Sequence, residues 1–277
     1  MLVGLSMLVA GAGAGVFGSL LGLGGGVLIV PLLTLGFGLP LREAVGVSLV
    51  SVIVTSSAAA SVFLGRHSAN LRLGMSLELF TAAGAIIGGV LAFVLDEREL
   101  AGLFAALLIY VAISMLRRSD ASAPPAVAEA SGEPGADPTG DRRSWILERL
   151  SGPGYRVRRL GTGIVGAVAA GIISALLGVG GGIVKVPLMH LVMGVPLRVA
   201  TATSNLMIGI TASASAIIYL FRGGLDPYAA GPTAIGVFIG ASIGSRIAHR
   251  VDVRLLRILF TVVLLYTAYE MIVKAFG

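Results

Sequence analysis

The sequence predicts an all-α integral membrane protein made of two inverted repeats, each with about five helical segments and a broken or re-entrant helix at a glycine motif. Composition is the first observation behind this prediction. Hydrophobic residues make up 56% of the 277-residue chain and charged residues only 12%, whereas a soluble domain has about 25% charged residues. Uncharged runs at 1–41, 199–221 and 227–245 are long enough to cross a bilayer as helices. They lack the alternating polarity of membrane β-strands.

The second observation is an internal repeat. Residues 15–66 return at 171–222 with a shift of 156 residues, no gap and 23 identities in 52 aligned positions. Each copy has an apolar run, a Gly-x-Gly-Gly-Gly motif, a short apolar run with an internal proline, and a Pro-Leu-Arg stop. We therefore divide the chain into a first repeat at 1–118, a flexible cytoplasmic linker at 119–158 and a second repeat at 159–277.

The first repeat contains five predicted helical segments. The segment after the glycine motif has only 12 residues. As a helix it is about 18 Å long at 1.5 Å per residue, too short to span a bilayer, so a broken or re-entrant segment is expected. The next two spans are followed by the charged clusters Arg66 to Arg72 and Asp96 to Glu99. The five segments are 2–21, 27–38, 43–64, 73–95 and 100–116.

The linker and the second repeat follow the same plan. Residues 119–158 are rich in Ala, Pro, Ser, Gly and Glu and show no sustained apolar period, which is typical of a flexible linker. After it the five segments recur at 160–177, 183–194, 199–221, 227–248 and 254–275. The two halves are therefore expected to share one fold.

Arginine positions predict the orientation in the membrane. If the basic linker is cytoplasmic, 96–99 lies outside and 246–257, its equivalent in the second half, lies inside. The net charges of the two loops fit this placement, because the outer loop has a net charge of −2 and the inner loop a net charge of +3. This favours an odd number of crossings per half and inverted repeats, with both termini outside. A re-entrant short segment would change that parity.

The two glycine turns are the first candidate site. A helix that stops at the glycines and another that starts after them expose free amides and the positive end of a helix dipole, which together hold a small anion. The alternative is that glycines only let helices approach closely, which accounts for Gly11, Gly15, Gly84, Gly88, Gly240 and Gly244. Three consecutive glycines before a short helix favour a site. Its residues are Gly22, Gly24, Gly25, Gly26, Gly178, Gly180, Gly181 and Gly182.

Hydroxyl residues in the next segment form a second group. Ser48 and Thr55, and equally Ser204 and Thr211, lie seven residues apart and so share a helix face that is a candidate polar path. The alternative for each hydroxyl is a hydrogen bond back to its own helix or to a neighbour. We select Ser48, Ser204 and Asn205 because that position recurs in both halves.

Lys185 breaks the symmetry, since the first half has Ile29 at the equivalent position. An ionisable group inside an apolar segment is a functional candidate, able to hold an anion or to release a proton. The alternative is that its long side chain reaches the membrane interface. His190 and Glu78 are weaker candidates, because each lies near a predicted helix boundary.

Composition and motifs exclude several classes of function. The chain has no cysteine, and its three histidines are scattered, so thiol chemistry and a metal cluster are not expected. The net charge of +6 comes from arginines at the ends of apolar runs. This pattern is typical of membrane insertion and contact with anionic lipids, and not of nucleic-acid binding. No paired carboxylates or activated nucleophile point to an enzyme. No nucleotide-binding loop appears, and no cofactor is expected.

The two motifs resemble a known family. GLGGGVLIVPLL with AVGVSL, and GVGGGIVKVPLM with ATATSNL, are similar to the two repeats of sulfite exporter TauE/SafE membrane permeases. The resemblance covers nearly the whole chain except the linker. It maps family motif residues onto Gly22 to Gly26, Pro31 and Ser48, and onto Gly178 to Gly182, Pro187 and Ser204; Lys185 and Asn205 depart from the more apolar family pattern. It implies a bacterial-type inner-membrane carrier for sulfite, sulfonates or related sulfur anions.

These arguments lead to one functional prediction. We expect a multi-pass inner-membrane secondary transporter that moves a small sulfur-containing anion by alternating access, with the anion held at the paired glycine turns. An anion channel with the same site is the alternative. The expected partners are the small anion, a coupled H⁺ or Na⁺ and the lipid bilayer, and not nucleic acid; a homodimer is left open.

Overall fold

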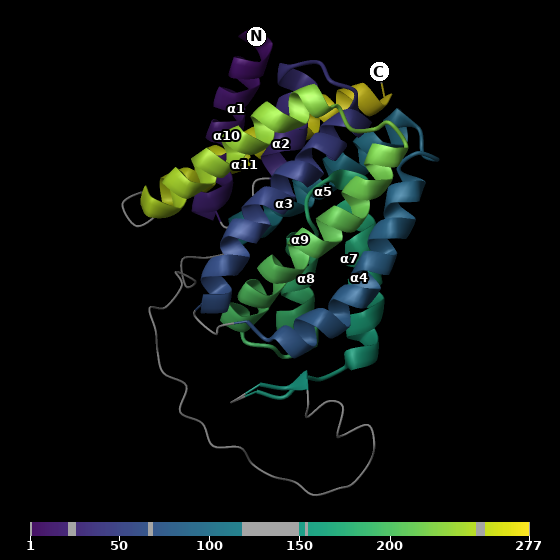
Figure 1. Cartoon of the computed structure of the whole chain (residues 1–277), viewed down its shortest axis with the longest axis vertical. Coiled ribbons are helices and arrows are strands. Elements are labelled where there is room, and N and C mark those ends of the chain that lie inside the picture. Colours follow the sequence, from purple (N-terminus) through teal and green to yellow (C-terminus); the bar gives the residue numbers. More distant parts are fainter. Residues whose placement is uncertain are drawn as a thin grey trace, which may run out of the picture.

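A computed structural model describes residues 2–21, 26–65, 69–117, 150–152, 155–247 and 253–276. The elements named there are all helices, as the sequence predicts (Figure 1). The five segments predicted for each half are all present. In chain order they are α1 (Leu2–Leu21), α2 (Gly26–Pro31), η1 (Leu32–Gly36), α3 (Leu41–Gly65), α4 (Leu71–Leu91), α5 (Glu97–Arg117), α7 (Leu160–Leu177), α8 (Gly182–Pro187), η2 (Leu188–Val192), α9 (Leu197–Phe221), α10 (Pro227–Ile247) and α11 (Val253–Phe276).

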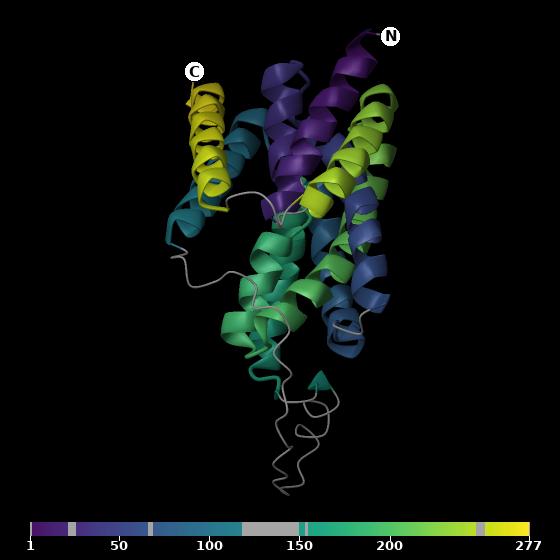
Figure 2. The same cartoon turned by 90° about the vertical axis from the view of Figure 1, so that its left-hand side faces the viewer.

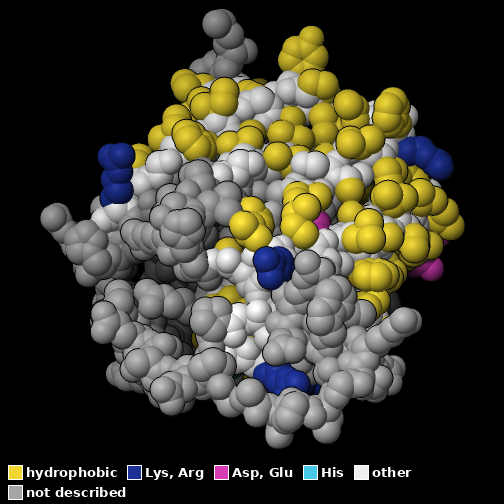
Figure 3. Space-filling view, turned by 60° about the horizontal axis from the view of Figure 1, so that its bottom comes forward, with side chains coloured by type: hydrophobic (Ala, Val, Ile, Leu, Met, Phe, Trp, Pro, Cys, Tyr) yellow, Lys and Arg dark blue, Asp and Glu magenta, His cyan; other side chains and the backbone are white. Residues whose placement is uncertain are grey.

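The surface of the bundle is suited to lipid. Within the described residues, three helical stretches are long and apolar enough to cross a membrane: Leu71–Leu91, Leu160–Leu177 and Val199–Phe221. Large apolar side chains also point outward from several helices, and Figure 3 shows them gathered over one face. Examples are Leu79 on α4, Ile243 on α10 and Val262 on α11, which are 71%, 50% and 60% exposed. Soluble proteins rarely expose so much contiguous apolar surface, so this surface indicates a membrane protein.

The two halves interlock. Helix α1 packs on α10 and α4 on α7, while α5 packs on α11 and α3 on α9. Figure 2 shows α11, in yellow, beside α5, and α1, in purple, beside α10. Each of these contacts joins one half of the chain to the other. The repeats identified in the sequence therefore build one helical body together.

Helices α3 and α9 are equivalent in the repeat and run in opposite directions. A Cβ on Gly46, early in α3, would overlap the carbonyl of Gly224, just after α9. A Cβ on Gly209, in the middle of α9, would lie 2.8 Å from the Ser56 Oγ in the second half of α3. Antiparallel equivalent helices are what inverted repeats require. The orientation across the membrane stays a prediction that this packing supports.

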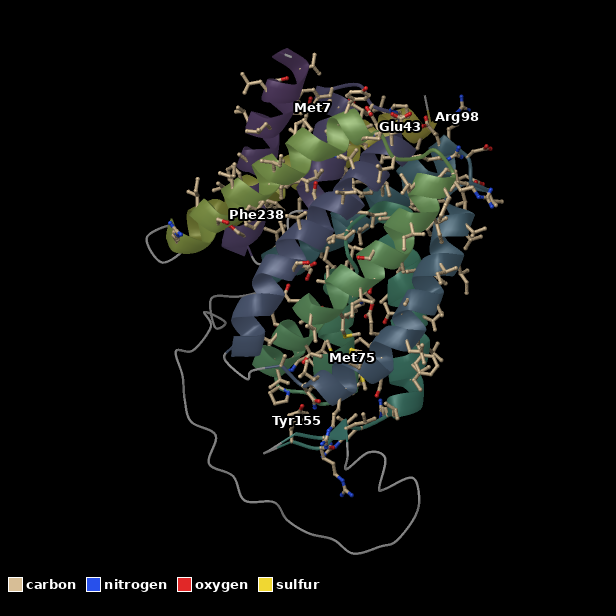
Figure 4. All side chains as sticks on the ribbon, in the orientation of Figure 1. Met7, Glu43, Met75, Arg98, Tyr155 and Phe238 are labelled. Atoms are coloured by element: carbon tan, nitrogen blue, oxygen red, sulfur yellow. The ribbon has the colours of Figure 1, made fainter. Side chains whose placement is uncertain are left out.

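Successive helices begin at alternate ends of the bundle, as the sequence predicts. In Figure 4, Glu43 and Arg98 lie at one end of the bundle, and Met75 and Tyr155 lie at the opposite end. Chain turns at 92–96 and at 69–70 are therefore on opposite ends of α4. Asn70 fixes the start of α4, because its side chain accepts a hydrogen bond from the Leu73 amide.

Glycines bring the paired helices together. A Cβ on Gly84 would overlap the Val168 carbonyl of α7, and one on Gly171 would overlap the Thr81 carbonyl of α4. On the other pair, a Cβ on Gly15 would overlap the Val237 carbonyl, and one on Gly240 the Ala12 carbonyl. The packing role predicted for Gly15, Gly84 and Gly240 is confirmed.

The short segments after the glycine motifs are helical but do not have the length of a span. Gly26–Gly36 and Gly182–Val192 each begin as α-helix and change to π-helix after the internal proline. Proline has no amide to continue the α-helical hydrogen bonds, so the backbone widens there. Both segments end alike: the Leu39 amide bonds to the Leu33 carbonyl at 3.1 Å, and the Val195 amide to Met189 at 2.9 Å.

Most of the predicted linker lies outside the described residues. Its last part contacts the end of the bundle where α4 begins. The Asn70 Nδ2 donates to the Leu150 carbonyl at 2.8 Å and to the Tyr155 hydroxyl at 2.6 Å, and the Arg158 amide donates to the Met193 carbonyl at 2.9 Å. Residues 150–152 and 155–158 therefore join α4 to the end of η2.

Candidate functional site

The second glycine motif forms a turn that only glycine adopts readily. Helix α7 ends where the Gly178 amide bonds to the Ser174 carbonyl at 2.9 Å. Gly178, Gly180 and Gly181 then have φ angles of +66°, +79° and +72°. Residues with a Cβ are disfavoured in this left-handed region. The glycines are therefore needed for the turn itself, beyond any role in helix packing.

This turn presents backbone amides at the start of α8. The Val184 and Lys185 amides bond back to the Gly181 carbonyl at 3.1 and 2.9 Å. The Gly182 and Ile183 amides come before the first helical hydrogen bond, so they have no partner within the helix. Unpaired amides at a helix start are suited to bind negative charge.

The two glycine motifs meet at the centre of the bundle. A Cβ on Gly26 would lie 2.8 Å from the Gly178 carbonyl oxygen and 3.3 Å from the Val179 Cα. Ser48 of α3 joins them, since its hydroxyl donates to the Gly178 carbonyl at 2.7 Å and lies 3.2 Å from the Gly26 carbonyl. Ser48 thus connects the second glycine turn to Gly26 at the start of α2. Gly22, Gly24 and Gly25 lie outside the described residues.

Two buried hydroxyls next to the second turn have no hydrogen-bond partner: Ser174 Oγ and Ser204 Oγ. Ser174 is 0% exposed and Ser204 1%. The Ser174 Cβ is 3.2 Å from the position of a Cβ on Gly181, and the Ser204 Oγ is 3.6 Å from that of a Cβ on Gly182. Buried hydroxyls normally have partners, so two unpaired ones beside unpaired amides indicate a place for a polar ligand.

Ser174 is absent from the residues predicted from the sequence. Its equivalent in the first half is Gly18, so the comparison of the two repeats gives it no weight. A different signal was available, because Ser174 is an isolated hydroxyl in the last turn of an apolar helix, directly before a glycine motif.

Lys185 is buried and paired. Its Nζ lies 3.2 Å from the Glu78 Oε2 and donates to the Thr211 Oγ1 at 2.5 Å. The Thr211 Oγ1 also lies 2.6 Å from the Glu78 Oε1, so the three side chains, from α8, α4 and α9, form a closed cluster. Lys185 does not reach a membrane interface, and Glu78, 3% exposed, is not a boundary residue in contact with water.

The remaining predicted residues are less involved. Asn205 is partly exposed and, as the next residue along α9, points about 100° away from Ser204. The His190 Nδ1 faces the Val195 carbonyl at 2.9 Å. Bonding back to the residue's own helix is confirmed for several hydroxyls: Ser51, Thr55, Ser57, Thr201, Ser213 and Ser215.

The site therefore offers donors rather than a metal centre or a reactive nucleophile. Two amides with no partner within α8, two unpaired hydroxyls and the side chain of Lys185 lie around one turn. Within the described residues no group of three or more His, Cys, Asp and Glu side chains is placed to hold a metal ion. Such a set of donors is suited to bind an oxyanion reversibly.

Comparisons with known proteins agree with a transport function. The chain is 23% identical over 277 residues to the probable membrane transporter protein YunE of Bacillus subtilis, covering 96% of both chains. It is 27% identical to the probable membrane transporter protein MJ0441 of Methanocaldococcus jannaschii, covering 93% of this chain and 91% of the relative. It is 26% identical to the probable membrane transporter protein MamO of Magnetospirillum gryphiswaldense, covering 98% of this chain and 45% of that relative. No solved structure matches.

The family model agrees with the resemblance seen in the motifs. The model described as "Sulfite exporter TauE/SafE" matches residues 7–271, which include both glycine motifs and the Lys185 cluster. The protein is thus a membrane transporter and not an enzyme, with a small-molecule substrate and a lipid environment. The chain belongs to the sulfite exporter TauE/SafE family.

Proposed function

We propose that the protein is a secondary transporter for a small sulfur-containing anion, such as sulfite or an organosulfonate, that works by alternating access. The observation that carries this proposal is the second glycine turn, where the hydroxyls of Ser174 and Ser204 have no hydrogen-bond partner and lie next to Gly181 and Gly182 at the start of α8. The family description supports the class of substrate.

The position of this site suits alternating access. The turn touches Gly26 of the other repeat, and Ser48 bonds to it from α3. In transporters built from inverted repeats, the substrate lies where the two halves meet, at discontinuous helices. A movement of the helices on one side of this turn against those on the other side would therefore open the site to each side of the membrane in turn. We place the protein in the inner membrane as a multi-pass protein, with the linker in the cytoplasm.

The test is counterflow in liposomes that contain the purified protein. Vesicles loaded with unlabelled sulfite, sulfate, isethionate, sulfoacetate or taurine are diluted into the labelled compound. A carrier gives saturable uptake that is accelerated by internal substrate, for at least one of the sulfur anions. A channel gives flux without this acceleration, which would favour the alternative over the carrier. Flux of none of these compounds would contradict the proposed function.

A glycine variant locates the site. Gly182→Ala adds a methyl group 3.6 Å from the Ser204 Oγ, and its closest neighbour is the flexible end of Ile208. We expect slower counterflow in a protein that still folds. Gly161→Ala is the matched control, because a Cβ there meets nothing within 4 Å. Equal counterflow in both variants would argue against an anion at this turn.

A further inference from the structure

The Lys185 cluster carries more than a positive charge for the site. Lys185, Glu78 and Thr211 come from three helices, and the Lys185 and Glu78 side chains are 2% and 4% exposed. Lys185 donates to both partners, and Thr211 lies within hydrogen-bond distance of both Lys185 and Glu78. Placing an ion pair in a buried setting costs free energy that its own attraction seldom fully offsets. A role in the transport cycle would account for it.

The cluster lies directly against the glycine turn. The Lys185 Cε is 3.4 Å from the position that a Cβ on Gly181 would take, close to the side chain of Ser174. The Lys185 side chain thus lies against the same turn that begins α8. Because a lysine side chain rotates about four bonds, the ammonium can turn from Glu78 toward an anion at the turn without a change of the backbone.

Charge balance decides what must accompany the anion. With Lys185 charged and Glu78 ionised, the empty cluster is neutral. A monoanion that draws Lys185 away leaves Glu78 as an unpaired buried carboxylate, which is strongly unfavourable. If Glu78 takes up one proton as the anion arrives, the cluster and its ligand are neutral again. Burial therefore favours joint binding of one anion and one proton.

We propose that Glu78 is the proton-coupling residue of this transporter, with Lys185 exchanging its partner from the Glu78 carboxylate to the bound anion. This inference rests on the proposed carrier function and names its coupling ion. One proton adds to a Glu78 carboxylate oxygen when one monoanion binds, and both leave on the other side. No other bond forms or breaks, and the step carries no net charge.

The other described ionisable groups on the helices around the cluster are not placed to take up the proton instead of Glu78. Helix α7 contains no ionisable residue. The described ones on the other elements are engaged elsewhere or are exposed: His190 faces the Val195 carbonyl, the Tyr219 hydroxyl donates to the Ala175 carbonyl, and Arg72 is exposed at the start of α4.

The repeat limits this coupling to one cluster. The first half has Ile29 at the position of Lys185, and the second half has Ala234 at the position of Glu78. Only the hydroxyl recurs, as Thr55 and Thr211. A ratio of one proton to one monoanion therefore follows.

The test compares two readouts on the full-length protein in liposomes, with labelled isethionate as the probe. Isethionate stays a monoanion near neutral pH and carries no proton of its own. Counterflow without a pH gradient reports transport. Net accumulation driven by an outside pH about one unit lower than the inside reports coupling, and one-to-one coupling gives up to roughly tenfold accumulation.

We expect wild type to show both activities. Glu78→Gln keeps the shape of the side chain and can still accept from Lys185 through its one oxygen, while its NH2 group can donate to the Thr211 hydroxyl. It takes up no proton, so it should still exchange isethionate while accumulation falls from up to roughly tenfold to about one. Glu78→Asp should retain acid-driven accumulation. Glu43→Gln, at the start of α3 and the other end of the bundle (Figure 4), is the matched control and should behave as wild type.

The outcomes separate the two proposals. Acid-driven accumulation in Glu78→Gln at the wild-type ratio, or wild-type exchange without acid-driven accumulation, would overturn the coupling role and leave the carrier intact. Absence of counterflow in wild type for all five compounds named above would overturn the carrier and this inference with it. If Glu78→Gln does not fold, proton uptake by detergent-solubilised wild type tests whether anion binding is coupled to protonation. When isethionate is added, the protein should take up about one proton per bound anion. Binding without proton uptake would contradict the proposal.

Discussion

Lys185 and Glu78 form a buried pair whose two members depend on each other. Removing one partner leaves an uncompensated charge, which typically costs about 3–5 kcal/mol. We expect Lys185→Ala to lower the free energy of unfolding by about that amount, measured by denaturant titration in detergent. The double variant Lys185→Met with Glu78→Leu removes both charges and should be much closer to wild type. A double variant as unstable as the single one would show that the loss comes from packing.

At the residue scale, the sequence identified Lys185 but not its environment. A lysine inside an apolar run is visible in the sequence, and so is its absence from the first repeat. Its partner Glu78 lies 107 residues away on another helix, and no local spacing connects the two. Glu78 was named only as a weaker candidate, because it lies near a predicted helix boundary. Ser174 was not predicted, because its equivalent in the first half is Gly18 and positions shared by both repeats do not include it.

At the scale of elements, the close approach of α4 and α7 depends on glycine. A Cβ on Gly171 would overlap the Thr81 carbonyl and lie 2.8 Å from the Ala85 amide nitrogen, so the helices would have to separate. We expect Gly171→Ala to destabilise the protein by about 1–3 kcal/mol, as overpacking does.

Gly102→Ala in α5 is the matched control for Gly171→Ala. A Cβ at Gly102 meets nothing within 4 Å, and alanine favours a helix over glycine by about 1 kcal/mol. In thermal melts of both variants in detergent, the control should therefore be as stable as wild type or more stable. Equal melting temperatures for the two variants would contradict the close packing of α4 on α7.

The short helices could be predicted because their signals are local. Gly178, Gly180 and Gly181 form the turn before α8. Pro187, five residues after Gly182, ends α8, and the π-helix η2 follows it. The packing of α1 on α10 and α4 on α7 could not be predicted, because glycines on each helix indicate a close neighbour without saying which one. That choice depends on how the whole chain folds.

At the scale of the molecule, inverted repeats make a prediction about equivalent positions. Arg72 and Tyr228 are 156 residues apart, and both are exposed at the start of an equivalent helix. The chain has no cysteine, so Arg72→Cys and Tyr228→Cys each give one labelling site. We expect a membrane-impermeant thiol reagent on intact cells to label the second and not the first. Parallel repeats would place both on the same side and give both the same labelling.

The central claim is that the anion is held at the second glycine turn by the unpaired hydroxyls. The most direct test is the KM for counterflow of isethionate in the double variant Ser174→Ala with Ser204→Ala. Each lost hydrogen bond to a charged ligand is worth about 1.5–3 kcal/mol, so KM should rise roughly tenfold or more. Ser213→Ala, whose hydroxyl bonds back to Gly209 in the same helix as Ser204, should keep the wild-type KM. An unchanged KM in the double variant would place the anion elsewhere.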